Sequence, residues 1–171
     1  MSKESTSGWV WEVFASIQGE GIYCGQRQTF VRLAGCNLSC EYCDTPAARD
    51  PKPRFCRIET AAGTGGFQDV PNPVGASDIV DICRRLGSHT VSITGGEPLA
   101  QIVFLDALML ELKASDFNVH LETNGTLWQE LRRVVDCADV VAMDIKVPSA
   151  SGMDDLWDSH ARFLKTAVET E

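Results

Sequence analysis

Alternating hydrophobic and polar residues predict two strands near the start of the chain. Trp9–Ser16 alternates and contains aromatic and β-branched residues, and a glycine-rich turn follows at Gln18–Gly21. Gln28–Leu33 is a second predicted strand, and Arg32 interrupts its apolar run. Because a guanidinium is costly to bury alone, Arg32 needs an anionic partner, either a protein carboxylate in a salt bridge or a bound ligand.

Three further strands are predicted in the second half of the chain, and each ends in a polar motif. They are Thr90–Thr94 before Gly95-Gly96-Glu97-Pro98, Val119–Glu122 before Thr123-Asn124-Gly125, and Val140–Asp144 before Lys146. The predicted helices are Asp78–Leu86 with Ser77 as N-cap and Gly87 as its end, Leu99–Lys113, Leu127–Cys137, and Met153–Thr170 after a turn at Ser149–Gly152. Strands that alternate with helices form a parallel sheet, so these motifs should meet at one edge of an α/β fold, as in a partial TIM-type barrel.

Length and composition predict one domain over residues 1–171. A chain of 171 residues with 44% hydrophobic residues can bury a single core. Residues 46–76 are rich in proline, glycine and small polar residues and are predicted to be a loop-rich insertion.

The charge of the chain argues against a nucleic-acid surface. Its formal net charge is −9, whereas phosphate backbones are bound by clustered cations. The local basic clusters, Arg54–Arg57 and Arg84-Arg85, are typical of solvated faces.

Met1–Gly8 is polar and predicts neither a signal peptide nor a membrane span. Seven cysteines, three of them crowded together, predict a reducing, cytoplasmic location and no disulfide framework.

Three cysteines in one short loop are the main candidate for chemistry. Cys36, Cys40 and Cys43 have the spacing CxxxCxxC, and thiolates are the ligands that iron–sulfur clusters prefer. Three protein ligands would leave one iron of a cubic cluster open. A structural zinc site is less well supported because it needs a fourth ligand and no second pair of cysteines or histidines follows. A redox dithiol at Cys40 and Cys43 is a third alternative.

The cysteine motif and its flanks resemble a known enzyme family. Phe14–Gly21, Phe30–Leu38 and Cys43–Thr45 are similar to the 7-carboxy-7-deazaguanine synthases of the radical S-adenosylmethionine (radical SAM) superfamily. The resemblance covers nearly the whole chain and implies a radical SAM core with a 4Fe-4S cluster, S-adenosylmethionine and Mg²⁺. The implied reaction is a radical ring contraction of 6-carboxy-5,6,7,8-tetrahydropterin with loss of ammonia, in queuosine and 7-deazapurine biosynthesis.

The resemblance also assigns the site residues. It implies cofactor contacts from Tyr42, Cys43, Asp44, Gly96, Glu97, Glu122, Asn124, Asp144, Ile145 and Lys146, with the Glu97 carboxylate facing the amino group of the cofactor. It implies substrate contacts from Ile17, Gln18, Gly19, Glu20, Arg32 and Thr94, with Arg32 on the substrate carboxylate. The implied metal ligands are Cys36, Cys40 and Cys43 for the cluster and Thr45 for magnesium.

Partners and alternatives complete the sequence prediction. The cluster needs an electron donor such as a flavodoxin or ferredoxin, the substrate is a free pterin, and a homodimer is one option for the oligomeric state. Related synthases continue beyond the end of this sequence, so the resemblance predicts an incomplete barrel. The alternatives are an activating enzyme that forms a glycyl radical on a partner protein, and a non-catalytic zinc-binding module.

Overall fold

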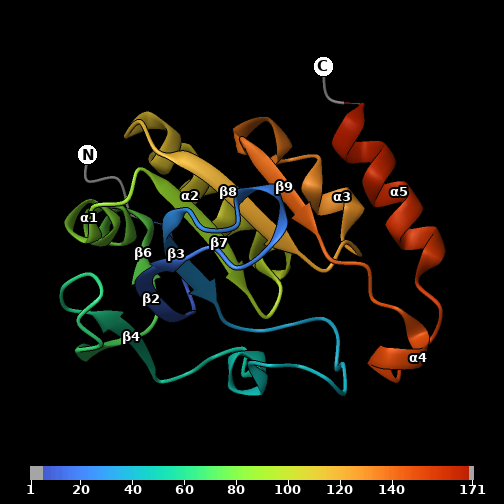
Figure 1. Ribbon diagram of the computed structural model, residues 1–171, viewed down its shortest axis with the longest axis horizontal. Coiled ribbons are helices and arrows are strands. Elements are labelled where there is room, and N and C mark those ends of the chain that lie inside the picture. The colour runs from blue at the N-terminus through green and yellow to red at the C-terminus, as the bar shows by residue number, and fades with distance from the viewer. Residues whose placement is uncertain (1–5, 170–171) are drawn as a thin grey trace.

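A seven-stranded mixed sheet forms the centre of the fold in the computed structural model, which describes residues 6–169 (Figure 1). The strands of this sheet lie in the order β5-β4-β2-β3-β7-β8-β9, and β1 and β6 form a small second sheet. The strands are β1 Ser7–Gly8, β2 Val10–Ile17, β3 Arg27–Leu33, β4 Phe55–Glu59, β5 Phe67–Pro71, β6 Val74–Gly75, β7 Thr90–Gly95, β8 Asn118–Thr123 and β9 Val140–Met143. The helices are α1 Ala76–Leu86, α2 Ile102–Ala114, α3 Trp128–Leu131, α4 Pro148–Ser151 and α5 Trp157–Val168, with 3₁₀ turns η1 Gly21–Tyr23, η2 Pro46–Arg49, η3 Pro98–Gln101 and η4 Val135–Cys137.

Four neighbouring strands are parallel, as the sequence predicts. β3, β7, β8 and β9 run in one direction, so their carboxyl ends lie at the same edge of the sheet. The cysteine loop follows β3, and the three polar motifs follow β7, β8 and β9. We call this edge the loop edge.

The remaining strands correct the prediction of a sheet made of parallel strands. β2 pairs with β3 antiparallel and β4 pairs with β5 antiparallel, while β2 and β4 are parallel to each other. The connection from β2 to β3 is too short for a crossover helix, and such short connections produce antiparallel hairpins. The turn after β2 therefore lies at the edge of the sheet opposite the loop edge.

Residues 46–76 are more regular than the loop-rich insertion predicted from the sequence. They contain η2, the hairpin of β4 and β5, and the short strand β6. β4 pairs with the edge of β2, and Cys56 and Ile58 on β4 are buried in the core. The prediction was wrong because pairing with a distant strand, which local composition does not reveal, orders this segment.

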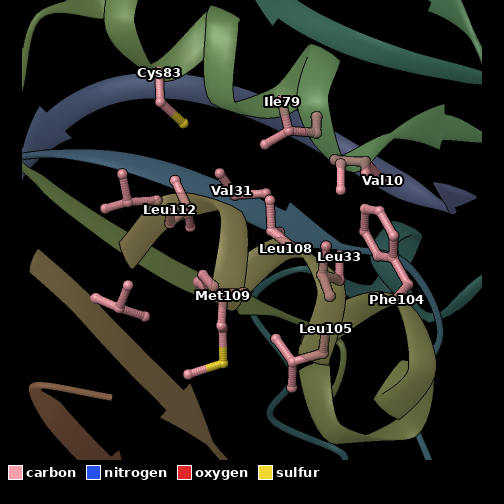
Figure 2. Close-up of a cluster of buried hydrophobic side chains, with 14 of the residues drawn as sticks. Val10, Val31, Leu33, Ile79, Cys83, Phe104, Leu105, Leu108, Met109 and Leu112 are labelled. Carbon is pink, nitrogen blue, oxygen red and sulfur yellow. The ribbon is translucent and has the colours of Figure 1, made fainter. Parts of the chain in front are cut away.

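Helices α1 and α2 cover one face of the sheet, and the hydrophobic core lies between them and the strands. Figure 2 shows Ile79 and Cys83 of α1 on one side of this core and Leu105, Leu108 and Met109 of α2 on the other. α1 begins at Ala76 with Gly75 as N-cap, so the predicted Ser77 cap was wrong by two residues. Its end was confirmed, because Gly87 takes a left-handed conformation there with φ of 74°.

Three further helices also differ from the sequence prediction in their boundaries. Leu127–Cys137 is not continuous, because α3 ends at Leu131 and a separate 3₁₀ turn leads the chain toward β9. α2 begins at Ile102 after the 3₁₀ turn Pro98–Gln101. α5 begins at Trp157, four residues later than predicted, and the predicted end at Thr170 lies outside the described residues. The predicted turn at Ser149–Gly152 is mainly the one-turn helix α4.

The other face of the sheet is curved and polar. We call it the inner face and define it by Glu12, Arg32, Ser92, Thr94 and Glu122, which alternate along their strands with core residues. Gln18, just past β2, donates a hydrogen bond to Glu122 of β8 at 2.7 Å. In a flat sheet, strands three positions apart are separated by about 14 Å, so the sheet curls toward this face as in a partial barrel.

The core predicts a clear difference between two leucines of α2. Leu108 is fully buried, whereas 54% of Leu110 is exposed. We expect Leu108→Ala to lower the free energy of unfolding by about 3 kcal/mol, because it leaves a cavity in the core. The matched variant Leu110→Ala should change it by less than about 0.5 kcal/mol. Urea denaturation of both variants checks this, and equal losses would contradict the described packing.

No helix within residues 6–169 has the length and apolar character needed to cross a membrane.

Candidate iron-sulfur and cofactor site

The cysteine loop leaves the sheet after β3 and extends to the segment around α4 (Figure 1). Within it, Leu38 N donates a hydrogen bond to Cys36 Sγ at 3.4 Å, and Cys43 N donates one to Cys40 O at 3.3 Å. Cys40 is buried, with its Sγ 3.8 Å from Met153 Sδ. The loop is therefore held by its own backbone and by the chain that follows β9.

The donor set of this loop fits an iron–sulfur cluster. Cys36, Cys40 and Cys43 are all free thiols. Burial raises the pKa of Cys36, the Leu38 N–H opposes the rise, and the nearby acidic groups of Glu97, Cys40 and Cys43 raise it further. The three cysteines are thus close enough to repel one another as thiolates, and bound iron would remove that repulsion. Among residues 6–169, no three His, Cys, Asp or Glu side chains are arranged to hold a single metal ion.

The glycines at the end of β7 let its backbone pack against the cysteine loop. Gly96 N donates to Leu33 O at 3.1 Å, and Glu97 N donates to Gly35 O at 2.8 Å. A Cβ atom on Gly96 would lie 2.6 Å from the carbonyl carbon of Gly35 and 3.0 Å from Cys36 Cβ. Only glycine fits here, so the Gly-Gly motif has a packing role besides its predicted contact with the cofactor.

Glu97 is buried, and its carboxylate accepts hydrogen bonds from other groups of the chain. Its carboxylate, with no exposed surface, accepts hydrogen bonds from Leu99 N at 3.0 Å, Thr123 Oγ1 at 2.9 Å and Asn124 N at 2.8 Å. Burial raises its pKa to about 7, and these three donors limit the rise. The sequence predicted a carboxylate that faces the cofactor, whereas here it joins the ends of β7 and β8. A direct contact with the cofactor stays a prediction.

The raised pKa of Glu97 makes stability depend on pH. The unfolded carboxyl releases its proton near its ordinary pKa of 4.5 and the folded one near 7, so the folded state binds more protons between these values. The free energy of unfolding should therefore fall as pH rises from about 4.5 to 7, by about 3 kcal/mol at most. We expect Glu97→Gln to lack this contribution. Urea denaturation of both cluster-free proteins at several pH values checks it, and identical pH profiles would contradict it.

Asn37 and Thr126, which the sequence prediction missed, connect the cysteine loop to the end of β8. Asn124 Nδ2 donates to Asn37 Oδ1, and Asn37 Nδ2 donates to Thr126 Oγ1, both at 2.9 Å. Thr126 Oγ1 also donates to Asn124 Oδ1 at 2.6 Å. The predicted cofactor residue Asn124 thus lies beside the cluster loop. The position of Asn37 inside the cysteine motif was the signal that could have identified it.

Glu122 and Gln18 were predicted for different ligands but bind each other. Gln18 Nε2 donates to Glu122 Oε1 at 2.7 Å, and Ser92 Oγ donates to the same oxygen at 2.8 Å. Ser92 was missed because a serine within a strand carries no motif. Of the predicted group from Ile17 to Glu20, only Gln18 is buried, whereas Ile17 and Glu20 are exposed. The structure therefore does not bring the side chains of Ile17, Gln18 and Glu20 together on the inner face.

Arg32 has a protein carboxylate as its partner. Its Nε lies 3.0 Å from Glu12 Oε1, and the two side chains are 19% and 17% exposed. Thr94, also predicted to bind substrate, is its register partner on β7. This is the salt bridge that the sequence left open as one alternative, and it leaves the other guanidinium nitrogens for a ligand.

The last predicted group closes the site near β9. Lys146 forms an ion pair with Asp144, and its Nζ lies 5.2 Å from the centroid of the Tyr42 ring. Burial lowers the pKa of Lys146, but the hydrogen bond and charge of Asp144 outweigh it and leave the pKa raised. Ile145 is 43% exposed, and Thr45 Oγ1 donates to Asp44 Oδ1 at 3.1 Å. The structure thus brings Tyr42 and Lys146 together across more than a hundred residues of sequence.

A match to a protein-family model identifies the superfamily of this chain. The model described as "Radical SAM superfamily" matches residues 30–166, from β3 through most of α5. The chain belongs to the radical SAM superfamily. Members of this superfamily bind a 4Fe-4S cluster and S-adenosylmethionine, so Cys36, Cys40 and Cys43 would hold the cluster. This overturns the alternative of a non-catalytic zinc-binding module.

Two similar relatives carry the same name. The chain is 44% identical over 164 residues to the 7-carboxy-7-deazaguanine synthase of Geobacter sulfurreducens and 42% identical over 163 residues to that of Methanopyrus kandleri. Each match covers 91% of this chain and 64% of the relative, so the chain spans less than two thirds of the length of these relatives.

A solved structure confirms the radical SAM fold. The crystal structure of QueE from Escherichia coli superposes with a TM-score of 0.62 at 23% identity, covering 91% of this chain and 67% of that one. At this identity the similarity concerns the fold alone.

Proposed function

We propose that this chain carries the core of a 7-carboxy-7-deazaguanine synthase, which contracts the ring of 6-carboxy-5,6,7,8-tetrahydropterin with loss of ammonia. The similarity to curated synthases over 91% of the chain carries this proposal. It includes the cysteine loop, the inner face and the residues that follow β7 and β8. The relatives from Geobacter and Methanopyrus are both named as synthases, which favours this function over an activating enzyme that acts on a partner protein.

The inner face offers recognition of an acidic planar substrate. Arg32 can bind a carboxylate through two parallel hydrogen bonds, and Glu12 would keep its guanidinium in place. Thr94 lies beside it on β7, and Gln18 is held by Glu122 on the opposite side of the curved sheet. The backbone of Ile17, Gly19 and Glu20 would approach the pterin ring.

The residues at the loop edge would hold the cofactors. Gly96 and Asn124 lie against the cysteine loop, while Tyr42, Asp144 and Lys146 border it from the β9 side. When bound, the cluster and S-adenosylmethionine supply the one-electron chemistry that removes a hydrogen atom from the substrate. The task of this chain is to place the substrate next to the cofactor and to exclude water.

The proposal also covers the Mg²⁺ ion, the electron donor, the cellular location and the oligomeric state. Thr45, with Asp44 beside it, would provide a hydroxyl ligand to Mg²⁺, which prefers oxygen donors and keeps several waters. A flavodoxin or ferredoxin would supply the electron. We further propose a single domain over residues 1–171, a cytoplasmic location and a pterin that is free and not part of RNA. A homodimer remains a prediction, to be checked by light scattering.

The direct test is product formation by the reconstituted protein. The chain is loaded with iron and sulfide without oxygen, then incubated with S-adenosylmethionine, dithionite, Mg²⁺ and the carboxypterin. Mass spectrometry should detect 7-carboxy-7-deazaguanine and 5′-deoxyadenosine. Because the relatives are longer, the Geobacter synthase is assayed beside it as the positive control. If 5′-deoxyadenosine forms but the deazaguanine does not, the superfamily chemistry is present and the proposed substrate is wrong.

Arg32 should act mainly in substrate binding. Arg32→Lys keeps the positive charge next to Glu12 but loses the paired nitrogens of a guanidinium, so we expect KM for the carboxypterin to rise about tenfold or more. The cluster content should stay unchanged. The steady-state rate at increasing substrate concentrations checks this. An unchanged KM would show that Arg32 serves only the salt bridge with Glu12.

A further inference from the structure

We propose that a cationic surface beside the cysteine loop is the docking site for a small acidic protein that carries one electron. The surface consists of the exposed cations Lys52 and Arg54 and the half-buried Arg49, whose Nε is buried, and we call these three residues the basic strip. The inference rests on the electron that radical SAM chemistry requires and not on the proposed pterin substrate.

The basic strip adjoins the first cysteine of the cluster loop. Gly35 N, one residue before Cys36, donates a hydrogen bond to Ala48 O at 2.8 Å. A Cβ atom on Gly35 would lie 3.4 Å from Pro51 Cα, so the chain that bears the strip packs directly on this residue. The strip is therefore fixed close to the place where the cluster would bind.

An open cleft reaches from Pro51, in the segment that carries the strip, to Cys36. It has a volume of about 450 Å³, and Trp9, Cys36, Pro51 and Val103 are among the residues that line it. Lys52 Nζ lies 5.2 Å from the centroid of the Trp9 ring, which places one cation of the strip beside the cleft. The wall formed by the start of α2, including Val103, lies on the helix-covered side of the sheet, and the inner face stays available for cofactor and substrate.

The charge of the strip differs from that of the rest of the chain. The whole chain has a net charge of −9, whereas residues 49–54 contain three cations and a single carboxylate, Asp50. Lys52 and Arg54 are exposed. Within residues 6–169 none of the three cations forms an ion pair, although other cations of the chain do, among them Arg32, Arg84, Lys113, Arg133, Lys146 and Lys165.

This pattern fits an acidic partner better than other occupants. The overall charge repels an acidic protein, so an uncompensated cationic strip gives it one preferred orientation, with its redox group toward Cys36. Trp9 and Val103, which is 64% exposed, supply apolar contact area inside a charged rim, as in transient protein interfaces. The transfer itself makes and breaks no bond: the carrier is oxidised by one electron, and the cluster is reduced by one.

Charge reversal in the strip tests the proposal. The variant Lys52→Glu/Arg54→Glu is compared with Arg84→Glu/Arg85→Glu, which makes the same charge change at exposed positions of α1. Both are reconstituted with iron and sulfide, and their binding to a reduced acidic flavodoxin is measured by titration calorimetry at low and high ionic strength. We expect about tenfold weaker binding for the strip variant at low ionic strength, little change for the control, and a smaller difference at high salt.

Two further measurements locate the contact with the carrier and distinguish weaker docking from a damaged cluster. A carbodiimide should cross-link carrier carboxylates to Lys52, and Lys52→Arg should keep the affinity but lose this cross-link. Reduction of the cluster by flavodoxin, followed by electron paramagnetic resonance, should slow in the strip variant, while reduction by dithionite should not. Neither readout requires the pterin, so failure of the proposed function would not affect them.

Several outcomes would overturn the proposal. These are equal weakening in both charge-reversal variants, unchanged flavodoxin binding in the strip variant, or parallel loss of reduction by dithionite. Binding of a single-stranded RNA with equal affinity and equal dependence on the strip would show a general anion surface. Self-association that disappears with the strip, in the absence of carrier binding, would show an interface between two copies of the chain.

Discussion

Cys40→Ala is expected to abolish both the iron–sulfur cluster and turnover. Cys40 would be the middle ligand of the CxxxCxxC loop and is buried next to Met153, whose neutral thioether cannot supply a thiolate. With two cysteines left, the loop should not retain a four-iron cluster during reconstitution. Iron and sulfide analysis, together with paramagnetic resonance of the dithionite-reduced protein, checks the first part. Formation of 5′-deoxyadenosine checks the second.

An isolated cysteine provides the control for this variant. Cys24 is exposed and lies in the turn after β2, at the sheet edge opposite the loop edge. We expect Cys24→Ala to keep the iron and sulfide content of the wild type and its rate of turnover. Retention of cluster and turnover by Cys40→Ala would contradict the assignment of the three cysteines as ligands.

Gly96→Ala is expected to disrupt the cysteine loop through a steric clash, although Gly96 is not part of the loop. The added methyl group would collide with the carbonyl of Gly35 and press on Cys36 Cβ, and the Gly35 carbonyl belongs to backbone that cannot rotate away. The end of β7 is also tied there by hydrogen bonds from Gly96 N to Leu33 O and from Glu97 N to Gly35 O. We expect the free energy of unfolding to fall by about 3 kcal/mol and cluster incorporation to fall with it.

Gly19 offers a matched substitution in open space. A Cβ atom on Gly19 would meet no atom within 4 Å, and its φ lies outside the left-handed region. Gly19→Ala should therefore leave stability and cluster content close to those of the wild type. Urea denaturation and iron analysis of both variants provide the comparison. Equal behaviour of the two would show that the approach of β7 to the cysteine loop is less tight than described.

Cys40→Ala and Gly96→Ala distinguish the loss of a cluster ligand from the loss of the backbone packing that supports the loop. Cys40→Ala removes a ligand and should cost the cluster even in a well-folded chain. Gly96→Ala keeps all three cysteines and alters only the backbone against which their loop rests. Loss of the cluster in both would indicate that the loop needs the fixed end of β7 in order to hold iron. Such dependence of a metal site on its surroundings is common.

The sequence by itself determined the chemistry of the site. Three thiols within one short loop favoured an iron–sulfur site, because ligands that lie close together in sequence need little tertiary information. The repeated order of strand, polar motif and helix likewise predicted that the loop edge collects the motifs after β7, β8 and β9. The gathering of the motifs at the loop edge was confirmed, because β3, β7, β8 and β9 are parallel. The superfamily match supports the iron–sulfur cluster, whereas the three cysteine ligands stay a prediction.

Only the tertiary structure decided how distant polar residues pair. Gln18 and Glu122 are separated by 104 positions and meet because the sheet curls, and Glu97 is buried because the ends of β7 and β8 both donate hydrogen bonds to it. The β4–β5 hairpin was missed for the same reason, since its order comes from the edge of β2. Such contacts depend on which strands become neighbours and how strongly the sheet twists, and these are properties of the folded chain as a whole.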